Sequence, residues 1–308
     1  MSSPCLKTRV GGLSLQTPII AASGTFGYGL EFEPYLDLNR IGGLVTKGIS
    51  LEAREGNPPQ RIYETASGML NAIGLANVGL QSFIKDKLPA LRKLECAVIV
   101  NLYGEAESEF AELARALDSQ EGIAALELNV SCPNVKAGGM AFGIDPQAVA
   151  GVTRAVKAET KLPVWVKLTP NVTSPVPIAQ AAAKAGADAI CLINTLLGMA
   201  IDARVRRPRL ANVMGGLSGP AIKPVGLRMV WQVAQALPDM PVVGMGGIVN
   251  GEDAAEYLIA GASAVQVGTG NFTDPSACAR IADELAKFCS ENGVSDIKEL
   301  IGSLQTPA

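Results

Sequence analysis

The sequence predicts an α/β protein, a single (β/α)8 TIM barrel with long loops at its C-terminal face and a short N-terminal β-ribbon. Eight short apolar runs alternate with helical stretches, as parallel strands do in βαβ units. The chain has 308 residues, 48% of them hydrophobic, which suits one barrel with a large core. We therefore expect residues 1–308 to form one domain. Five of the runs stop on a polar residue, and these are Lys47, Asn101, Asn129, Lys167 and Asn194.

The order of the elements follows from the same runs. Two short extended segments, Leu6–Val10 and Leu13–Leu15, flank Gly11-Gly12 and predict a ribbon across the bottom of the barrel. The eight strands are then expected near Ile19–Ala22, Gly43–Lys47, Ala97–Leu102, Ala125–Val130, Pro163–Leu168, Ala189–Ile193, Pro241–Met245 and Ala264–Val267.

Helix starts are signalled at two places. Asp145 precedes Pro146, and proline suits the first turn of a helix. Asn250 precedes Glu252 and Asp253, whose charges favour a helix N-terminus. Both positions predict the beginning of a helix that covers the barrel.

Three links between elements are longer than the rest. They are Gly48–Gly79, Ser131–Ile144 and Thr195–Lys223, after the second, fourth and sixth strands. In a barrel all three lie at the carboxyl ends of the strands, where ligands bind. We expect irregular binding loops or lids here, with plain surface connections as the alternative.

Composition excludes several classes of function. A net charge of −3 argues against a nucleic-acid surface or a basic membrane patch. The uncharged stretches Val10–Leu30 and Thr65–Ile84 are interrupted by Gly, Ser, Pro or Asn, so neither predicts a membrane helix. The N-terminus lacks the pattern of a signal peptide, and we expect a cytoplasmic protein. The six cysteines form no C-x-x-C pair, so no metal or iron–sulfur site is predicted.

The chain has no histidine, so any acid–base chemistry falls to Cys, Lys, Asp or Glu. Cys132 stands in a polar loop after the fourth strand, next to Pro133. A free thiol has a pKa of about 8.5 and works as a base when it is partly thiolate. An inert buried thiol is the alternative for a lone cysteine.

The last two strands run into glycines, at Gly246-Gly247 and at Gly268. Bare backbone N–H groups after strands seven and eight of a barrel are a frequent phosphate site. None of these runs spells the dinucleotide fingerprint G-x-G-x-x-G, so a nicotinamide dinucleotide site is not supported.

A phosphate site beside a ring of Lys and Asn predicts a flavin mononucleotide (FMN) across the barrel mouth. Lys167 would lie near the N1–C2 edge of the flavin and favour its anionic reduced form, while Asn101 and Asn129 would bond the pyrimidine edge. The alternative for Lys167 is a side chain that reaches out to water.

Four longer motifs carry a resemblance that runs nearly end to end. Together they resemble the catalytic subunit of the NAD-linked, class 1B dihydroorotate dehydrogenases. The motifs are Glu64–Leu75, Asn129–Gly139, Asn194–Leu196 and Gly215–Pro224. The resemblance implies an FMN barrel that oxidises dihydroorotate to orotate in pyrimidine (UMP) synthesis. It makes Cys132 the base that takes the C5 proton, with the C6 hydride passing to N5 of FMN.

The resemblance also implies a role for each matching position. FMN contacts are expected from Ser23, Lys47, Gly48, Asn101, Asn129, Lys167, Ile193, Gly219, Gly246, Gly247, Gly268 and Thr269. Substrate contacts are expected from Lys47, Asn71, Ala72, Ile73, Gly74, Leu75, Asn129, Asn134, Asn194 and Thr195.

A partner is implied as well, because this chain has no evident means of binding NAD. The resemblance implies a second subunit that carries FAD and a [2Fe–2S] cluster, docked on a homodimer of barrels in a heterotetramer. Three alternatives stay open: a fumarate-dependent class 1A dihydroorotate dehydrogenase, an FMN barrel acting on another dihydropyrimidine, and a barrel that binds a phosphorylated ligand without redox chemistry.

Overall fold

Eight parallel strands close into a barrel in the computed structural model, which describes residues 4–130 and 139–307. Each strand pairs with the next in sequence, and the last barrel strand pairs with the first. The strands are β3 (Ile19–Ala21), β4 (Gly43–Val45), β7 (Ala97–Leu102), β8 (Ala125–Asn129), β9 (Val164–Lys167), β10 (Ala189–Leu192), β15 (Val242–Met245) and β16 (Ala264–Val267). All eight predicted strands are confirmed, with ends that differ by at most two residues.

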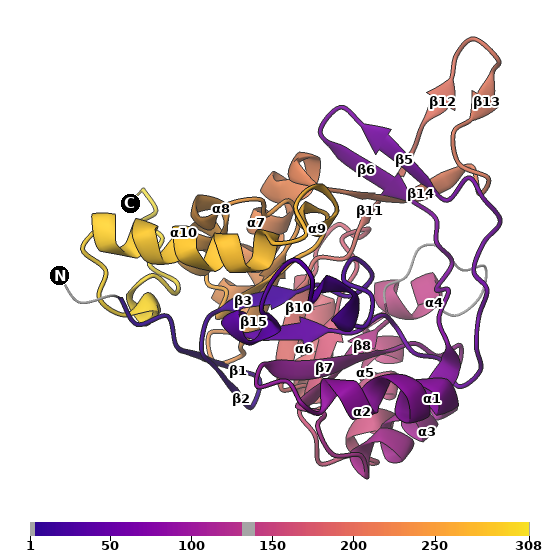
Figure 1. Cartoon of the computed structure of the whole chain (residues 1–308), viewed down its shortest axis with the longest axis horizontal. Coiled ribbons are helices and arrows are strands. Elements are labelled where there is room, and N and C mark those ends of the chain that lie inside the picture. The colour runs from indigo at the N-terminus through magenta and orange to yellow at the C-terminus, as the bar shows by residue number, and fades with distance from the viewer. Residues whose placement is uncertain (1–3, 131–138, 308) are drawn as a thin grey trace.

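Helices surround the barrel, as Figure 1 shows. Outward side chains of the strands pack against these helices in one large apolar cluster. The helices are α1 (Gly79–Ser82), a π-helical segment η3 (Phe83–Lys87), α2 (Leu88–Leu91), α3 (Glu107–Asp118), α4 (Gly139–Ile144), α5 (Pro146–Lys157), α6 (Val176–Lys184), α7 (Lys223–Ala236), α8 (Gly251–Ile259), α9 (Gly270–Thr273) and α10 (Ala277–Glu291). Short 3-10 turns are η1 (Leu30–Phe32), η2 (Leu38–Arg40), η4 (Pro220–Ile222) and η5 (Ile297–Glu299).

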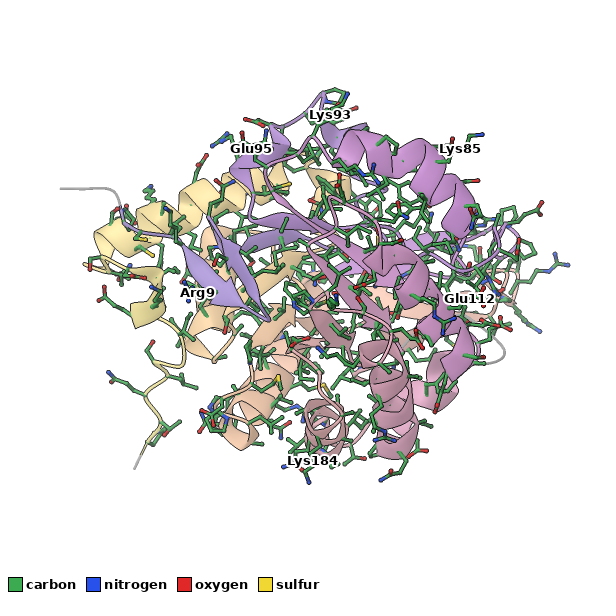
Figure 2. The ribbon with its side chains drawn as sticks, turned by 90° about the horizontal axis from the view of Figure 1, so that it is seen from below. Arg9, Lys85, Lys93, Glu95, Glu112 and Lys184 are labelled. Atoms are coloured by element: carbon green, nitrogen blue, oxygen red, sulfur yellow. The ribbon has the colours of Figure 1, made fainter. Side chains whose placement is uncertain are left out.

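Both predicted helix starts are confirmed. The Asp145 side chain accepts from the N–H of Gln147 at the start of α5, with proline in the first turn. Asn250 and Asp253 form a reciprocal capping box at the start of α8. Viewed from below in Figure 2, Lys85, Glu112 and Lys184 lie on outer helical segments, away from the centre of the barrel. No helix in the described ranges is both long enough and apolar enough to cross a membrane.

The lumen of the barrel is apolar at its amino end and polar at its carboxyl end. Alternation along a strand sends every second residue inward. On β8 these are Ala125, Glu127 and Asn129, while Leu126 and Leu128 face the helices. The inward residues at the amino end form their own buried cluster, which includes Trp165. The polar residues therefore collect where a barrel binds its ligand.

The N-terminal ribbon closes the bottom of the barrel. Strands β1 (Thr8–Val10) and β2 (Leu13–Leu15) pair antiparallel around Gly11 and Gly12, as predicted. Trp165 is fully buried, and its indole Nε1 donates to the carbonyl oxygen of Gly11 at 3.0 Å. This bond ties the ribbon to β9, because a buried carbonyl needs a donor.

Two of the long links are more ordered than the sequence indicated. They contain β5 (Ile62–Thr65), β6 (Gly68–Asn71), β11 (Leu196–Met199) and β14 (Met214–Ser218), which join in one four-stranded antiparallel sheet ordered β11-β14-β6-β5. A small hairpin, β12 (Ile201–Asp202) and β13 (Arg207–Pro208), extends from it. In Figure 1 this sheet and hairpin rise away from the barrel at the upper right. The expectation of irregular loops was wrong here. Paired residues such as Asn71 and Gly216 lie 145 positions apart, so the strands satisfy each other's backbone groups only after folding.

We expect Trp165→Phe to lower the free energy of unfolding by about 1–3 kcal/mol, because it removes the bond to Gly11 and leaves a small cavity. Urea denaturation measures the loss. Trp231→Phe is the matched control, since Trp231 lies on α7 and is only partly buried. Equal losses in the two variants would show that the ribbon contact adds no stability of its own.

Candidate active site

The five polar strand tips meet at the carboxyl end of the barrel. Asn129 and Lys167 are neighbours in register on β8 and β9. The Asn194 side chain, which follows β10, donates to the Oδ1 atom of Asn129 at 3.3 Å. Asn101 lies on β7, and Lys47 follows β4 by two residues. The predicted ring of polar tips is confirmed as a spatial arrangement.

A buried carboxylate lies beneath this ring, and the sequence analysis did not single it out. Glu127 is fully buried on β8, and its side chain accepts from Asn101 Nδ2 at 2.7 Å and from Gln266 Nε2 at 2.6 Å. The Nζ atom of Lys167 stands 3.7 Å from its Oε1 atom. A charged residue between Leu126 and Leu128, in an otherwise apolar strand, was the available signal, because charge is almost never buried without partners.

Two acceptor atoms in this layer are unpaired. Asn101 Oδ1 and Gln266 Oε1 are buried and have no hydrogen-bond partner among the described residues. A buried polar atom without a partner is costly, so a ligand that donates to it gains affinity. Gly48 fits against the same amide, because a Cβ at this position would come within 2.8 Å of Asn101 Oδ1.

Glycines form a cradle beside the ring. Gly246, Gly247, Gly268 and Thr269 follow β15 and β16, and in the described chain none of their N–H groups donates to another backbone group. Gly247 has φ +72, and a Cβ there would come within 2.9 Å of the carbonyl oxygen of Gly219. These four residues are partly exposed, and N–H groups without a backbone partner suit a phosphate group.

The four-stranded sheet brings the predicted substrate segment to the barrel mouth. Asn71 ends β6, and its Nδ2 atom donates to the carbonyl oxygen of Gly216 at 3.2 Å. A Cβ at Gly216 would overlap Thr195 Oγ1, which places Thr195 directly against this part of the sheet. Leu75 lies near Gly48, since its Cδ2 atom would be 3.8 Å from a Cβ there. Asn71, Thr195 and Leu75 thus converge on the barrel mouth.

The other predicted positions lie just after barrel strands or in the link that follows β4. Ser23 is partly exposed just after β3, and Ile193 is buried just after β10. Ala72 is buried, with its N–H bonded to the carbonyl of Arg61, and Ile73 follows it. Gly74 has φ +74, and a Cβ there would strike Asn57.

The two lysines of the mouth differ in their surroundings. Lys167 is 6% exposed, whereas Lys47 is partly exposed. Burial, followed by the nearby positive charge of Arg61, lowers the pKa of Lys47, and Glu31 opposes the effect. A lysine with a lowered pKa changes charge closer to neutral pH than a free lysine does.

Cys132 and Asn134 lie outside the described residues, so their predicted roles stay predictions. The other described cysteines offer a contrast. Cys96 is buried outside the lumen, and burial raises the pKa of its thiol to about 11. It is therefore protonated near neutral pH and is no candidate for a base.

Fold and site together define a (β/α)8 barrel with a polar ligand site at its carboxyl end. The family model described as dihydroorotate dehydrogenase matches residues 5–289. The chain belongs to the dihydroorotate dehydrogenase family.

Individual relatives agree along the whole chain. A protein of Geotalea uraniireducens is 57% identical over 306 residues, which cover 99% of this chain and 100% of the relative. Proteins of Geotalea daltonii and Geobacter metallireducens are each 56% identical over 305 residues, with the same coverage. All three bear the name dihydroorotate dehydrogenase B (NAD(+)), catalytic subunit.

Proposed function

We propose that this chain oxidises dihydroorotate to orotate in pyrimidine biosynthesis, as the catalytic subunit of an NAD-linked dihydroorotate dehydrogenase. The observation that carries the proposal is the meeting of the Lys/Asn ring, the glycine cradle and the Asn71–Leu75 segment at one barrel mouth. Family membership and the names of the full-length relatives support it.

FMN fits the residues present. The glycine cradle suits its phosphate, and the unpaired Asn101 Oδ1 and Gln266 Oε1 suit donors on a planar ring. Lys167 offers a positive charge at the same level of the barrel. When bound, FMN supplies a ring system that accepts a hydride.

The chain's own residues hold the substrate and manage the proton. Lys47 attracts the carboxylate of dihydroorotate, and the amides of Asn71, Asn129 and Asn194 bond the C=O and N–H edges of its ring. Cys132 accepts the proton from C5 as a thiolate. The Asn71–Leu75 end of the four-stranded sheet, where Leu75 lies near Gly48, would limit the access of water to the reacting atoms.

Electrons leave through a partner in this proposal. The relatives are named as catalytic subunits, which supports a second subunit. We propose that this subunit carries FAD and a [2Fe–2S] cluster and docks on a homodimer of the present chain. A cytoplasmic location stays a prediction.

The central test uses the purified full-length chain. We expect a yellow protein whose flavin absorbance bleaches when dihydroorotate is added without oxygen. Artificial acceptors should restore the colour, whereas NAD should do so only when the partner subunit is present. A colourless protein that binds no FMN would contradict the proposal. Rapid use of fumarate would instead place the chain among the class 1A enzymes.

Cys132→Ala should keep FMN yet slow the bleaching by dihydroorotate at least about a hundredfold, the usual scale for a lost general base. Rapid mixing measures the rate. Cys96→Ala is the matched control and should bleach at the parent rate, because its buried thiol lies outside the lumen. Near-normal bleaching in Cys132→Ala would remove the cysteine from the mechanism.

The affinity for orotate should fall as the pH rises, because Lys47 loses its charge at a lower pH than a free lysine. Above the pKa of Lys47 the dissociation constant should rise by about tenfold per pH unit. Flavin difference spectra measure the binding. Lys47→Arg, which keeps its charge, should flatten this dependence, and an unchanged slope in that variant would exclude Lys47 as the group that titrates.

A further inference from the structure

Among residues 4–130 and 139–307, Glu127 is the one charged group of the lumen that the proposed reaction does not use. It is fully buried, and its neighbours in register are Asn101 on β7 and Trp165 on β9. Its two carboxylate oxygens accept from the amides of Asn101 and Gln266, which come from strands on either side of the lumen. Such a group is retained only with partners, because an isolated buried charge is strongly unfavourable.

The carboxylate fixes the orientation of both amides. An ionised carboxylate only accepts hydrogen bonds, so Asn101 and Gln266 must turn their NH2 groups toward Glu127. Their oxygens then point away from it, and they are two of the three buried side-chain polar atoms without a partner in the described chain, the third being Thr17 Oγ1. Reversing either amide would set two oxygens against each other. Glu127 therefore decides that these two amides offer acceptors, rather than donors, to a ligand.

The carboxylate also balances the charge of Lys167. The two side chains are 0% and 7% exposed, so water screens their interaction little. At 3.7 Å the ion pair is longer than a hydrogen bond, which leaves the ammonium N–H groups of Lys167 available to a ligand. The pair as a whole is neutral. A ligand at this level of the lumen lies next to the Lys167 ammonium, with the Glu127 carboxylate behind it.

We propose that Glu127 is a positioning residue, which acts through Lys167 and Asn101 to set both the charge and the hydrogen-bonding pattern that the bound flavin meets. This inference rests on the function proposed above. Its physical consequence is a flavin potential that reflects the neutral pair, because the anion partly offsets the stabilisation that Lys167 gives to the negative charge gained on reduction.

The first experiment tests the pair without any flavin. We would compare the unfolding midpoints of the flavin-free full chain and of Glu127→Gln, Lys167→Met and the double variant. Each single change leaves one buried charge uncompensated, whereas the double change leaves none. The loss in the double variant should therefore be smaller than the sum of the two single losses. Additive losses would overturn the pairing, whether or not the chain binds FMN.

The second experiment tests whether the charge of Glu127 influences the potential of the bound flavin. The midpoint potential of bound FMN, measured by equilibration with a reference dye, should become more positive in Glu127→Gln than in the parent. It should also be more positive in the double variant than in Lys167→Met, because an anion is removed in both comparisons. An unchanged or more negative potential would overturn the electrostatic role and leave Glu127 a structural residue.

Cys191→Ala is the matched control for this measurement. The Cys191 thiol is buried beside Glu127 and interacts with it, but it is neutral, because burial and the carboxylate raise its pKa well above the usual value. This variant should lose stability without moving the potential. If Glu127→Gln alone fails to fold or to keep FMN, the double variant against Lys167→Met gives the same comparison. If neither of these keeps FMN, the unfolding comparison decides.

Discussion

The closed barrel limits which side chains can face its lumen, and the other features of the structure follow from this limit. Eight strands leave room only for side chains, so every inward residue must either pack or find a polar partner. The amino end meets this requirement with apolar side chains and Trp165, and the ribbon covers it. The carboxyl end meets it with Glu127, whose carboxylate gathers amide donors from β7 and β16 and the charge of Lys167 from β9. The candidate site lies at this polar network, on the carboxyl side of the apolar packing.

The four-stranded sheet beside the site is stabilised in a different way. The links after β4 and β10 hold short strands that are not stable alone, and they become stable by pairing with each other. This pairing places Asn71 beside Gly216, and Gly216 against Thr195. Glycine is required at position 216, because any side chain there would overlap Thr195. In the proposed function the sheet contributes contacts to the substrate, while the lumen residues contact the cofactor.

The two lysines at the barrel mouth differ in burial, and this difference suits them to different roles. Lys167 sits inside the lumen with a counter-anion, so its charge is held by the fold. Lys47 is nearer to water, and its partial burial, followed by the positive charge of Arg61, lowers its pKa. The inner lysine suits a permanent cofactor. The outer one suits a ligand that must enter and leave.

The barrel, its eight strands, the ribbon and the polar tips could be predicted from the sequence, because the two-residue period of a strand and the position of its last residue are local properties. The sequence also supplied the glycine ends of β15 and β16. It did not reveal the four-stranded sheet, since hydrogen bonds between segments as distant as β6 and β14 leave little local pattern. Nor did it reveal Glu127 as the centre of a network, although a charge between two leucines was visible. The donors that face this carboxylate are known only from the folded barrel, because Asn101, Lys167 and Gln266 come from three strands that meet when the barrel closes.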